Sequence, residues 1–294
     1  MKVVATITLA AAFGLSSNAS VAAALDERID AAGAEVVEVV NRSGSVTVTG
    51  GSDDVVVVSG SLGSNALGLD LDRDGDRIVV AVRYPEGDSG RNMASTLNIS
   101  MPRAAGLVVR SISADLEIGG IDGEQRLNTI SGDIVTAVGS ADVELRTVSG
   151  DMAITGRNEA AVLKAASVSG DFGADAIAGQ VDAATTSGDL QLLAGTLERA
   201  RLASVSGDIE VRAQVASKGS LVMESTSGDV AVVVEDAADI SVEAETFSGS
   251  IDSCFDAETD GGFGPGESLR FRKGDGDRSV RIMSFSGNVV VCDS

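Results

Sequence analysis

An aspartate recurs in this chain as the third residue of a repeated tetrapeptide, Ser-Gly-Asp followed by an apolar residue. The aspartates of the intact copies are Asp133, Asp151, Asp171, Asp189, Asp208 and Asp229. If the repeats stack in register, these carboxylates lie about 4.8 Å apart, where neighbours repel by about 1 kcal/mol even in water. Because Ca²⁺ takes carboxylate oxygens as ligands, one interpretation is a cation-binding column. The interpretation we favour is that each aspartate caps its own corner and faces solvent, since turn chemistry alone explains Asp after Ser-Gly.

A second acidic run, Asp70-x-Asp72-x-Asp74-Gly75, begins like a calcium-binding EF-hand loop. Its twelfth position is Ala81, where a bidentate glutamate is required, and no flanking helix is evident. The run therefore predicts the turn of a β-hairpin rather than a metal site.

Residue types suited to catalysis are scarce. The chain contains no histidine, which removes His-based triads and the usual general base. Asp151, Asp171 and Lys164 are of the types that polysaccharide-cleaving β-helix enzymes use, with or without Ca²⁺, but no non-repeated cluster stands out among them. We therefore expect no catalytic residues, no resident cofactor and no enzymatic activity.

The repeat itself must position the aspartates. From Ser113 to Ser248 the serines of successive copies are 18 to 21 residues apart, a period that suits one turn of a solenoid and is too short for helix-pair repeats. Apolar residues recur three and five positions after each serine and four and six positions before it, as Leu190 and Leu192 do after Ser187. This alternation predicts strands with one buried face. The strands are joined by a corner where glycine supplies backbone freedom and Asp and Ser fix the turn.

These observations predict an all-β fold, a single-domain parallel β-solenoid (β-helix) of about 18–21-residue coils with an N-terminal hairpin and cap region. One coil cannot bury its inner face alone, so each strand pairs in parallel with its equivalent one coil away. The predicted organisation is a signal peptide at 1–24, a first coil, hairpin and cap at 25–105, and regular coils at 106–294 with a loop at 256–266.

The first residues predict export. Lys2 precedes an apolar run through Leu15 and small residues up to Ala24, the pattern of a secretory signal peptide. The alternative is an N-terminal membrane anchor, but the run is short for a membrane span. No other segment is apolar for long enough, so we expect no transmembrane segment in the mature chain. The predicted location is periplasmic, or secreted to the cell surface.

The net charge of the chain limits which classes of binding partner are expected. The formal net charge is −22 at pH 7. A strongly acidic protein repels phosphate backbones, so we expect no nucleic-acid partner. Cations, basic partners and neutral glycans remain compatible with this charge.

Cys254 and Cys292 each lie six residues after the serine of their own repeat. Equivalent positions in adjacent coils are about 4.8 Å apart at Cα, which is inside the range that a disulfide tolerates. We predict a Cys254–Cys292 bridge that clasps the last coil, with the long segment between the two cysteines looped out. An oxidising compartment outside the cytoplasm permits the bridge. The alternative is two free thiols.

Taken together, these elements resemble a known group. They are the signal peptide, the early copy Ser43-Gly44-Ser45-Val46, the hairpin, the strand Leu97–Met101 before Pro102, and the tandem Ser-Gly-Asp-Ile/Leu repeats. The combination resembles the bacterial putative-adhesin family of β-solenoid proteins over roughly residues 35–294. The resemblance implies an exported bacterial β-solenoid and implies no catalytic residues.

The function that we expect is that of a non-catalytic, exported, adhesin-like module for binding or scaffolding in the bacterial cell envelope, with a glycan or an envelope protein as partner. Two alternatives stay open. A single non-repeated cluster of acidic and basic residues in a groove would indicate a polysaccharide-cleaving β-helix enzyme. A periplasmic partner of an envelope signalling system would have the same sequence features as a binding module.

Overall fold

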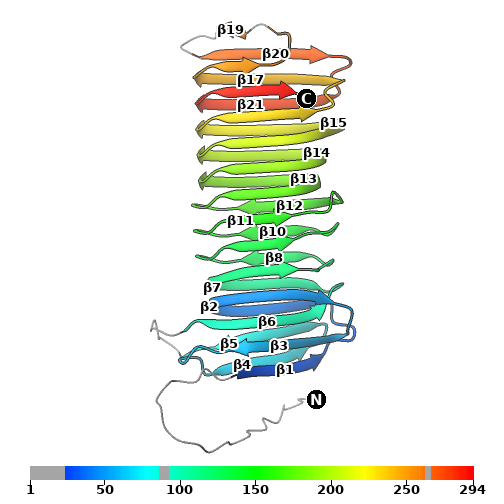
Figure 1. Cartoon of the computed structure of the whole chain (residues 1–294), viewed down its shortest axis with the longest axis vertical. Coiled ribbons are helices and arrows are strands. Elements are labelled where there is room, and N and C mark those ends of the chain that lie inside the picture. The colour runs from blue at the N-terminus through cyan, green and yellow to red at the C-terminus, as the bar shows by residue number, and fades with distance from the viewer. Residues whose placement is uncertain (1–23, 86–92, 258, 262–265) are drawn as a thin grey trace, which may run out of the picture.

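The protein is all-β, as the alternating pattern predicted. The computed structural model describes residues 24–85, 93–257, 259–261 and 266–294, and every regular element in these ranges is a strand, labelled β1 to β22. The strands lie across the long axis of an elongated molecule and are stacked one above another (Figure 1). The predicted signal peptide lies outside the described residues, apart from Ala24, which begins β1. Within the described residues, no helix is long and apolar enough to cross a membrane.

The N-terminal end is built from both parallel and antiparallel pairs. Its strands are β1 (Ala24–Asp30), β2 (Val36–Gly51), β3 (Val55–Ser61), β4 (Gly68–Asp74), β5 (Arg77–Arg83) and β6 (Ser95–Pro102). β2 pairs in parallel with β5 and β6 on one edge and with β7 on the other, while β3 pairs antiparallel with β1 and β6. The expected hairpin is present as the antiparallel pair β4–β5, which turns at Gly75 (φ 65°). Asp70 of the EF-hand-like run forms an ion pair with Arg83 across this hairpin, at 2.9 Å.

The middle of the molecule is a regular parallel stack. Its strands are β7 (Gly106–Gly119), β8 (Gln125–Asn128), β9 (Ile134–Ala137), β10 (Val143–Arg146), β11 (Met152–Thr155), β12 (Ala160–Ala166), β13 (Phe172–Ser187), β14 (Leu190–Ser206), β15 (Ile209–Ser227) and β16 (Val230–Glu235). Ser187 pairs with Ser206, and Ser206 pairs with Ser227. The pairing offset is therefore the repeat spacing read from the sequence, and each repeat contributes one layer.

The core runs along the stack as columns of equivalent side chains. In β16, Val230, Val232 and Val234 are buried and alternate with less buried positions, because successive side chains of a strand point to opposite faces. A column of small polar residues, two positions before each corner serine, is also buried: Thr129, Thr147, Ser167, Thr185, Ser204, Ser225, Ser284 and Thr246.

The C-terminal end departs from the expected order. Its strands are β17 (Ile240–Ser248), β18 (Ile251–Ser253), β19 (Thr259–Gly261), β20 (Glu267–Lys273), β21 (Arg278–Ser286) and β22 (Val289–Asp293). β21 lies between β15 and β17, and β22 lies between β16 and β18 (Figure 1). The last coil of the sequence is therefore the second-to-last layer of the parallel stack. β20 pairs antiparallel with the outer edge of β17, and β19, which falls in the segment 256–266 expected to be a loop, pairs with β20.

Candidate functional site

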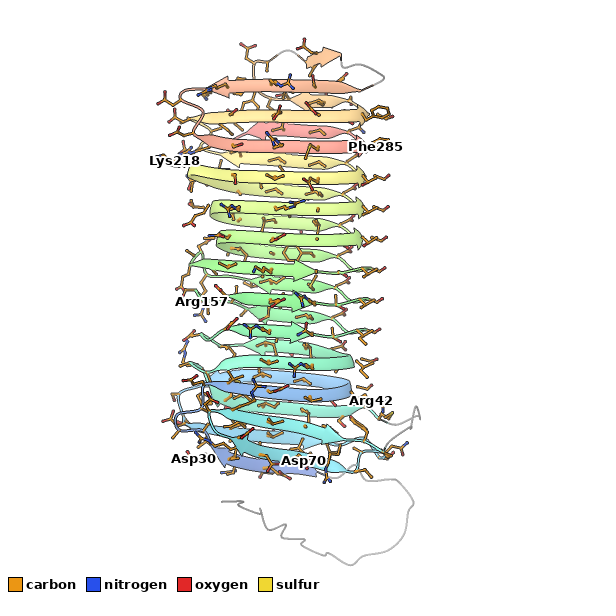
Figure 2. All side chains as sticks on the ribbon, turned by 180° about the vertical axis from the view of Figure 1, so that it is seen from behind. Asp30, Arg42, Asp70, Arg157, Lys218 and Phe285 are labelled. Carbon is orange, nitrogen blue, oxygen red and sulfur yellow. A yellow bond between two sulfur atoms is a disulfide. The ribbon has the colours of Figure 1, made fainter. Side chains whose placement is uncertain are left out.

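The Ser-Gly-Asp corners form one long edge of the molecule. Figure 2 shows Arg42 and Phe285, each directly before a corner serine, along this edge, with Arg157 and Lys218 along the opposite edge. The corners stack so closely that glycine is required. A Cβ added at Gly170 would lie 2.0 Å from the carbonyl oxygen of Gly150 in the layer below. The same repeat that folds each corner therefore sets its distance from the next one.

The aspartate column is a hydrogen-bonded ladder. The carboxylate of Asp133 accepts the backbone N–H of Asp151 at 2.9 Å, and that of Asp151 accepts the N–H of Asp171 at 2.9 Å. The pattern continues through Asp189, Asp208, Asp229, Asn288 and Ser250 at 2.7 to 3.2 Å. The expectation that each aspartate caps its own corner is corrected, because the amide that it accepts belongs to the next layer. This donor offsets the repulsion between successive carboxylates.

No cation is needed to hold this ladder together, since one oxygen of each carboxylate already has a donor. Within the ranges that the structure describes, no group of three or more Asp, Glu or Cys residues is arranged to hold a metal ion. A calcium column remains an expectation from the sequence.

Two substitutions at Asp171 distinguish the contribution of the hydrogen-bond acceptor from that of the negative charge. Asp171→Ala removes an acceptor from the N–H of Asp189 and is expected to lower the free energy of unfolding by about 1 kcal/mol. Asp171→Asn keeps a side-chain oxygen, as Asn288 does naturally in the same ladder, and removes one repelling charge. It is expected to match or exceed the wild-type stability. Urea unfolding of the three proteins checks this, and equal losses for Ala and Asn would contradict it.

The residues that could have served a polysaccharide-cleaving enzyme are not brought together. Asp151 and Asp171 lie on the corner ladder, whereas Lys164 lies in the middle of β12, five positions before its corner serine. Five residues of strand span about 16 Å. A general acid and base must both reach the same substrate atoms, so these three side chains do not form a catalytic group.

The sequence analysis missed an exposed apolar row at the same corner. The residue directly before each corner serine points outward, and at most layers it is apolar with 44% to 57% of its surface exposed: Ile112, Ile130, Val148, Val168, Val205, Phe285 and Phe247. From the layer of Ser113 to that of Ser248, Thr186 and Thr226 fill the remaining positions of this row. We call these nine residues the corner row. The sequence did contain a signal for this row. An apolar residue recurs one position before the serine, whereas the buried residues lie two, four and six positions before it.

The corner row ends in a pair of aromatic rings. Phe285 and Phe247 come from adjacent layers, their ring centroids are 4.9 Å apart, and their planes differ by 7°. Both rings are more than half exposed. Stacked exposed rings present a flat apolar platform, which is a candidate binding surface.

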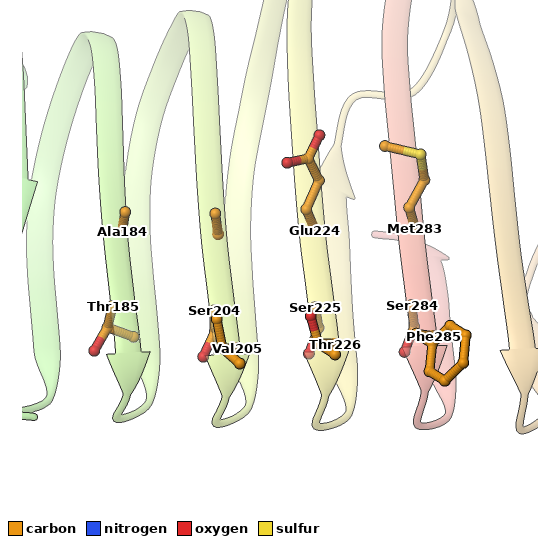
Figure 3. A pocket seen from close by; sticks show the side chains of 11 residues that line it. Ala184, Thr185, Ser204, Val205, Glu224, Ser225, Thr226, Met283, Ser284 and Phe285 are labelled. Carbon is orange, nitrogen blue, oxygen red and sulfur yellow. The ribbon is translucent and has the colours of Figure 1, made fainter. Parts of the chain in front are cut away.

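A shallow trough of about 540 Å³ lies beside this end of the corner row (Figure 3). Its lining comes from the positions one, two and three residues before the corner serines of β13, β14, β15 and β21. Ala184 and Ala203 leave space on one side, while Val205, Phe285 and Met283 supply apolar surface. Glu224 adds a carboxylate that is ion-paired with Arg201 at 2.6 Å.

Further along the same face, ion pairs cross between layers. Glu243 accepts hydrogen bonds from Arg270 and Arg281, each at 3.2 Å. The bond from Arg270, followed by that from Arg281, holds the pKa of Glu243 below its ordinary value, so the carboxylate stays charged. Charges paired in this way attract a charged ligand only weakly, which leaves the apolar corner row as the distinctive feature of this region.

The fold and this edge define an all-β protein whose stacked corners present an apolar row beside a carboxylate ladder. The chain belongs to the Toastrack DUF4097 family, whose model matches residues 12–192 and 174–291. No curated protein matches it.

Solved structures with low sequence identity also match. A "putative lipid binding protein" of Parabacteroides distasonis is 13% identical, with a TM-score of 0.49, covering 90% of this chain and 96% of its own. A "putative adhesin" of the same organism is 12% identical, with a TM-score of 0.45 and coverage of 93% and 98%. A "putative adhesin" of Bacteroides fragilis is 9% identical, with a TM-score of 0.42 and coverage of 92% and 97%.

Proposed function

We propose that the chain is an exported, non-catalytic, adhesin-like β-solenoid of the bacterial envelope that binds an extended polymer along its corner edge. The observation that carries the proposal is the corner row, in which exposed apolar side chains recur at most layers beside the Asp ladder. A surface that repeats one small contact at a fixed rise suits a polymer held by many weak contacts, because linked contacts add in free energy. The Cys254–Cys292 bridge supports export.

The polymer that we propose is a neutral glycan. The C–H faces of sugar rings can pack on Phe247 and Phe285. Sugar hydroxyls can donate to the ladder carboxylates of the preceding layers, of which Asp229 is the nearest. A net charge of −22 opposes polyanions, which disfavours acidic polysaccharides and nucleic acids. An envelope protein that covers the same row is the second candidate. Polysaccharide cleavage is not proposed, because Lys164 lies far from the corner carboxylates.

The first test is affinity electrophoresis of the mature protein in gels that contain neutral bacterial polysaccharides, with calcium and with chelator. We expect retardation that does not depend on calcium and no loss of polymer. Phe285→Ala is expected to weaken the apparent affinity about tenfold, since it removes one ring of the stacked pair. A cleared zone around the band would instead indicate a degrading enzyme.

Val135→Ala is the matched control for Phe285→Ala. Val135 is also about half exposed, but it lies on β9, beyond the corner and outside the trough. It should bind like the wild type. Equal weakening by both substitutions would contradict a site at the corner row, and retardation of neither protein in any gel would favour the protein partner.

A further inference from the structure

The last strands of the chain form a layer that is inserted between two layers built earlier. We call β21 and β22, residues 278–293, the inserted layer. Ser279 pairs with Ser220 on one side and with Ser241 on the other. Val289 likewise pairs with both Val230 and Ile251. Elsewhere in the regular stack each layer pairs with the one that precedes it by a single repeat, so the inserted layer depends on unusually long-range contacts.

The layers on either side of the inserted layer are separated in sequence by an ordinary single-repeat spacing. Ser227 and Ser248 are 21 residues apart, the spacing that also separates Ser206 from Ser227. β17 and β18 therefore carry the pattern needed to pair directly with β15 and β16. The same sequence is compatible with two packings, one with the layer in place and one with the gap closed, which is the basis of a two-state element.

In addition to its strand pairs and ladder contacts, the inserted layer has one anchor at each end. At its start, Arg278 contacts the connection between β16 and β17: its backbone N–H donates to the carbonyl of Asp239 at 3.1 Å, and its guanidinium donates to the carbonyl of Asp236. At its end, Cys292 is joined to Cys254 by the disulfide, with the Cα atoms 4.7 Å apart. Cys254 is exposed and Cys292 half-buried, so a reductant can reach the bridge.

The inserted layer also builds one wall of the trough. Met283 and Phe285 line the trough from β21, next to Glu224 and Thr226 of β15 (Figure 3). Phe285 supplies one of the two stacked rings. If the layer leaves, the trough loses this wall and the aromatic platform loses half of its surface.

We propose that the Cys254–Cys292 disulfide is a latch that keeps the inserted layer in place and thereby completes the ligand trough, an inference that rests on the proposed function for its link to binding. Opening the latch consumes a dithiol. The dithiol passes two electrons and two protons to the bridge and becomes a disulfide itself, while Cys254 and Cys292 become thiols. The element that this biases is the inserted layer, whose strand pairs all join it to segments distant in the sequence.

Hydrogen exchange on the full mature chain tests the latch without any ligand. In Cys254→Ser/Cys292→Ser, exchange at the amides of 279–291 is expected to rise about tenfold or more, while exchange at 190–211 stays as in the oxidised wild type. The wild type treated with dithiothreitol should behave like the double variant. Unchanged exchange at 279–291 would overturn the latch.

Arg278→Ala weakens the other anchor and leaves both cysteines in place. It is expected to raise exchange in the same segment. Its matched control, Arg212→Ala, removes a 2.9 Å ion pair to Glu235 on a regular layer and should leave the exchange at 279–291 unchanged. Equal effects from both arginine variants would contradict a special role for the inserted layer.

The link to binding has its own readout. In the polysaccharide gels, the double cysteine variant should lose retardation by a factor similar to that of Phe285→Ala. Faster exchange with retardation unchanged would overturn the link between latch and trough. No retardation of any form would reject the proposed function instead, and the latch would then be decided by the exchange data alone.

Discussion

Replacing Gly170 by alanine is expected to lower the free energy of unfolding by on the order of 3 kcal/mol or more, because the new methyl group clashes with the backbone of the neighbouring layer. Its Cβ would lie 2.0 Å from the carbonyl oxygen and 2.8 Å from the carbonyl carbon of Gly150. Both atoms are backbone, so no side-chain rotation relieves the clash. The two layers would have to separate at this corner, which breaks the hydrogen bond from the Gly150 N–H to the carbonyl oxygen of Ser169, at 3.3 Å.

Gly173→Ala is the matched control for this change. Gly173 lies three residues further along the same layer, on β13, and the nearest atom to its added Cβ is the carbonyl oxygen of Met152 at 4.0 Å. Alanine fits there and reduces the freedom of the unfolded chain, so stability should be unchanged or slightly higher. Urea unfolding of the two variants provides the comparison. Similar losses in both would mean that corner crowding is not what selects glycine in the repeat.

The repeat predicted much of the fold because its physical demands are local. Every intact copy has the order seen at Ser187, Gly188, Asp189 and the buried Leu190. A few neighbouring residues are therefore enough to specify a corner followed by an alternating strand. The all-β class, the parallel register and the Cys254–Cys292 contact all follow from counting along this unit.

The order of the last layers could not be predicted in the same way. Ser286 pairs with both Ser227 and Ser248, and all three serines belong to near-identical corners. A repeat with interchangeable edges does not specify which copy lies next to which, so the choice depends on long-range features such as the Arg278 contact and the disulfide. The bridge was predictable because any two adjacent layers place equivalent positions within reach.

The candidate site was only half visible in the sequence. The carboxylates drew attention because Asp is a chemically active residue, yet in the structure their oxygens accept amides of the next layer, for example Asp151 from Asp171. The corner row went unnoticed because Val148 or Val168 alone looks like an ordinary strand residue. Only the position of these residues, one before the serine and therefore outward, distinguishes them from the core.

Phe172→Ala is expected to cost about 3–5 kcal/mol, the usual cost of emptying a fully packed aromatic site. Phe172 is the largest of the fully buried side chains, at 1% exposure, and heads the inner column of β13. Its neighbours in the layers below and above are Met152 and Leu190, respectively. Strand pairing fixes the spacing of the layers, so the column cannot collapse to fill the space that the ring leaves. Urea unfolding measures the loss.

Two further substitutions serve as controls for the loss of stability expected in Phe172→Ala. Phe172→Leu places in this layer the side chain that Leu190 already supplies in the next one, and should cost less than about 1.5 kcal/mol. Phe247→Ala removes an exposed ring from the corner row and should change stability by less than about 0.5 kcal/mol while weakening retention by polysaccharide. A large loss of stability in Phe247→Ala would mean that the aromatic pair supports the fold, and the corner row would then lose its strongest claim to be a binding surface.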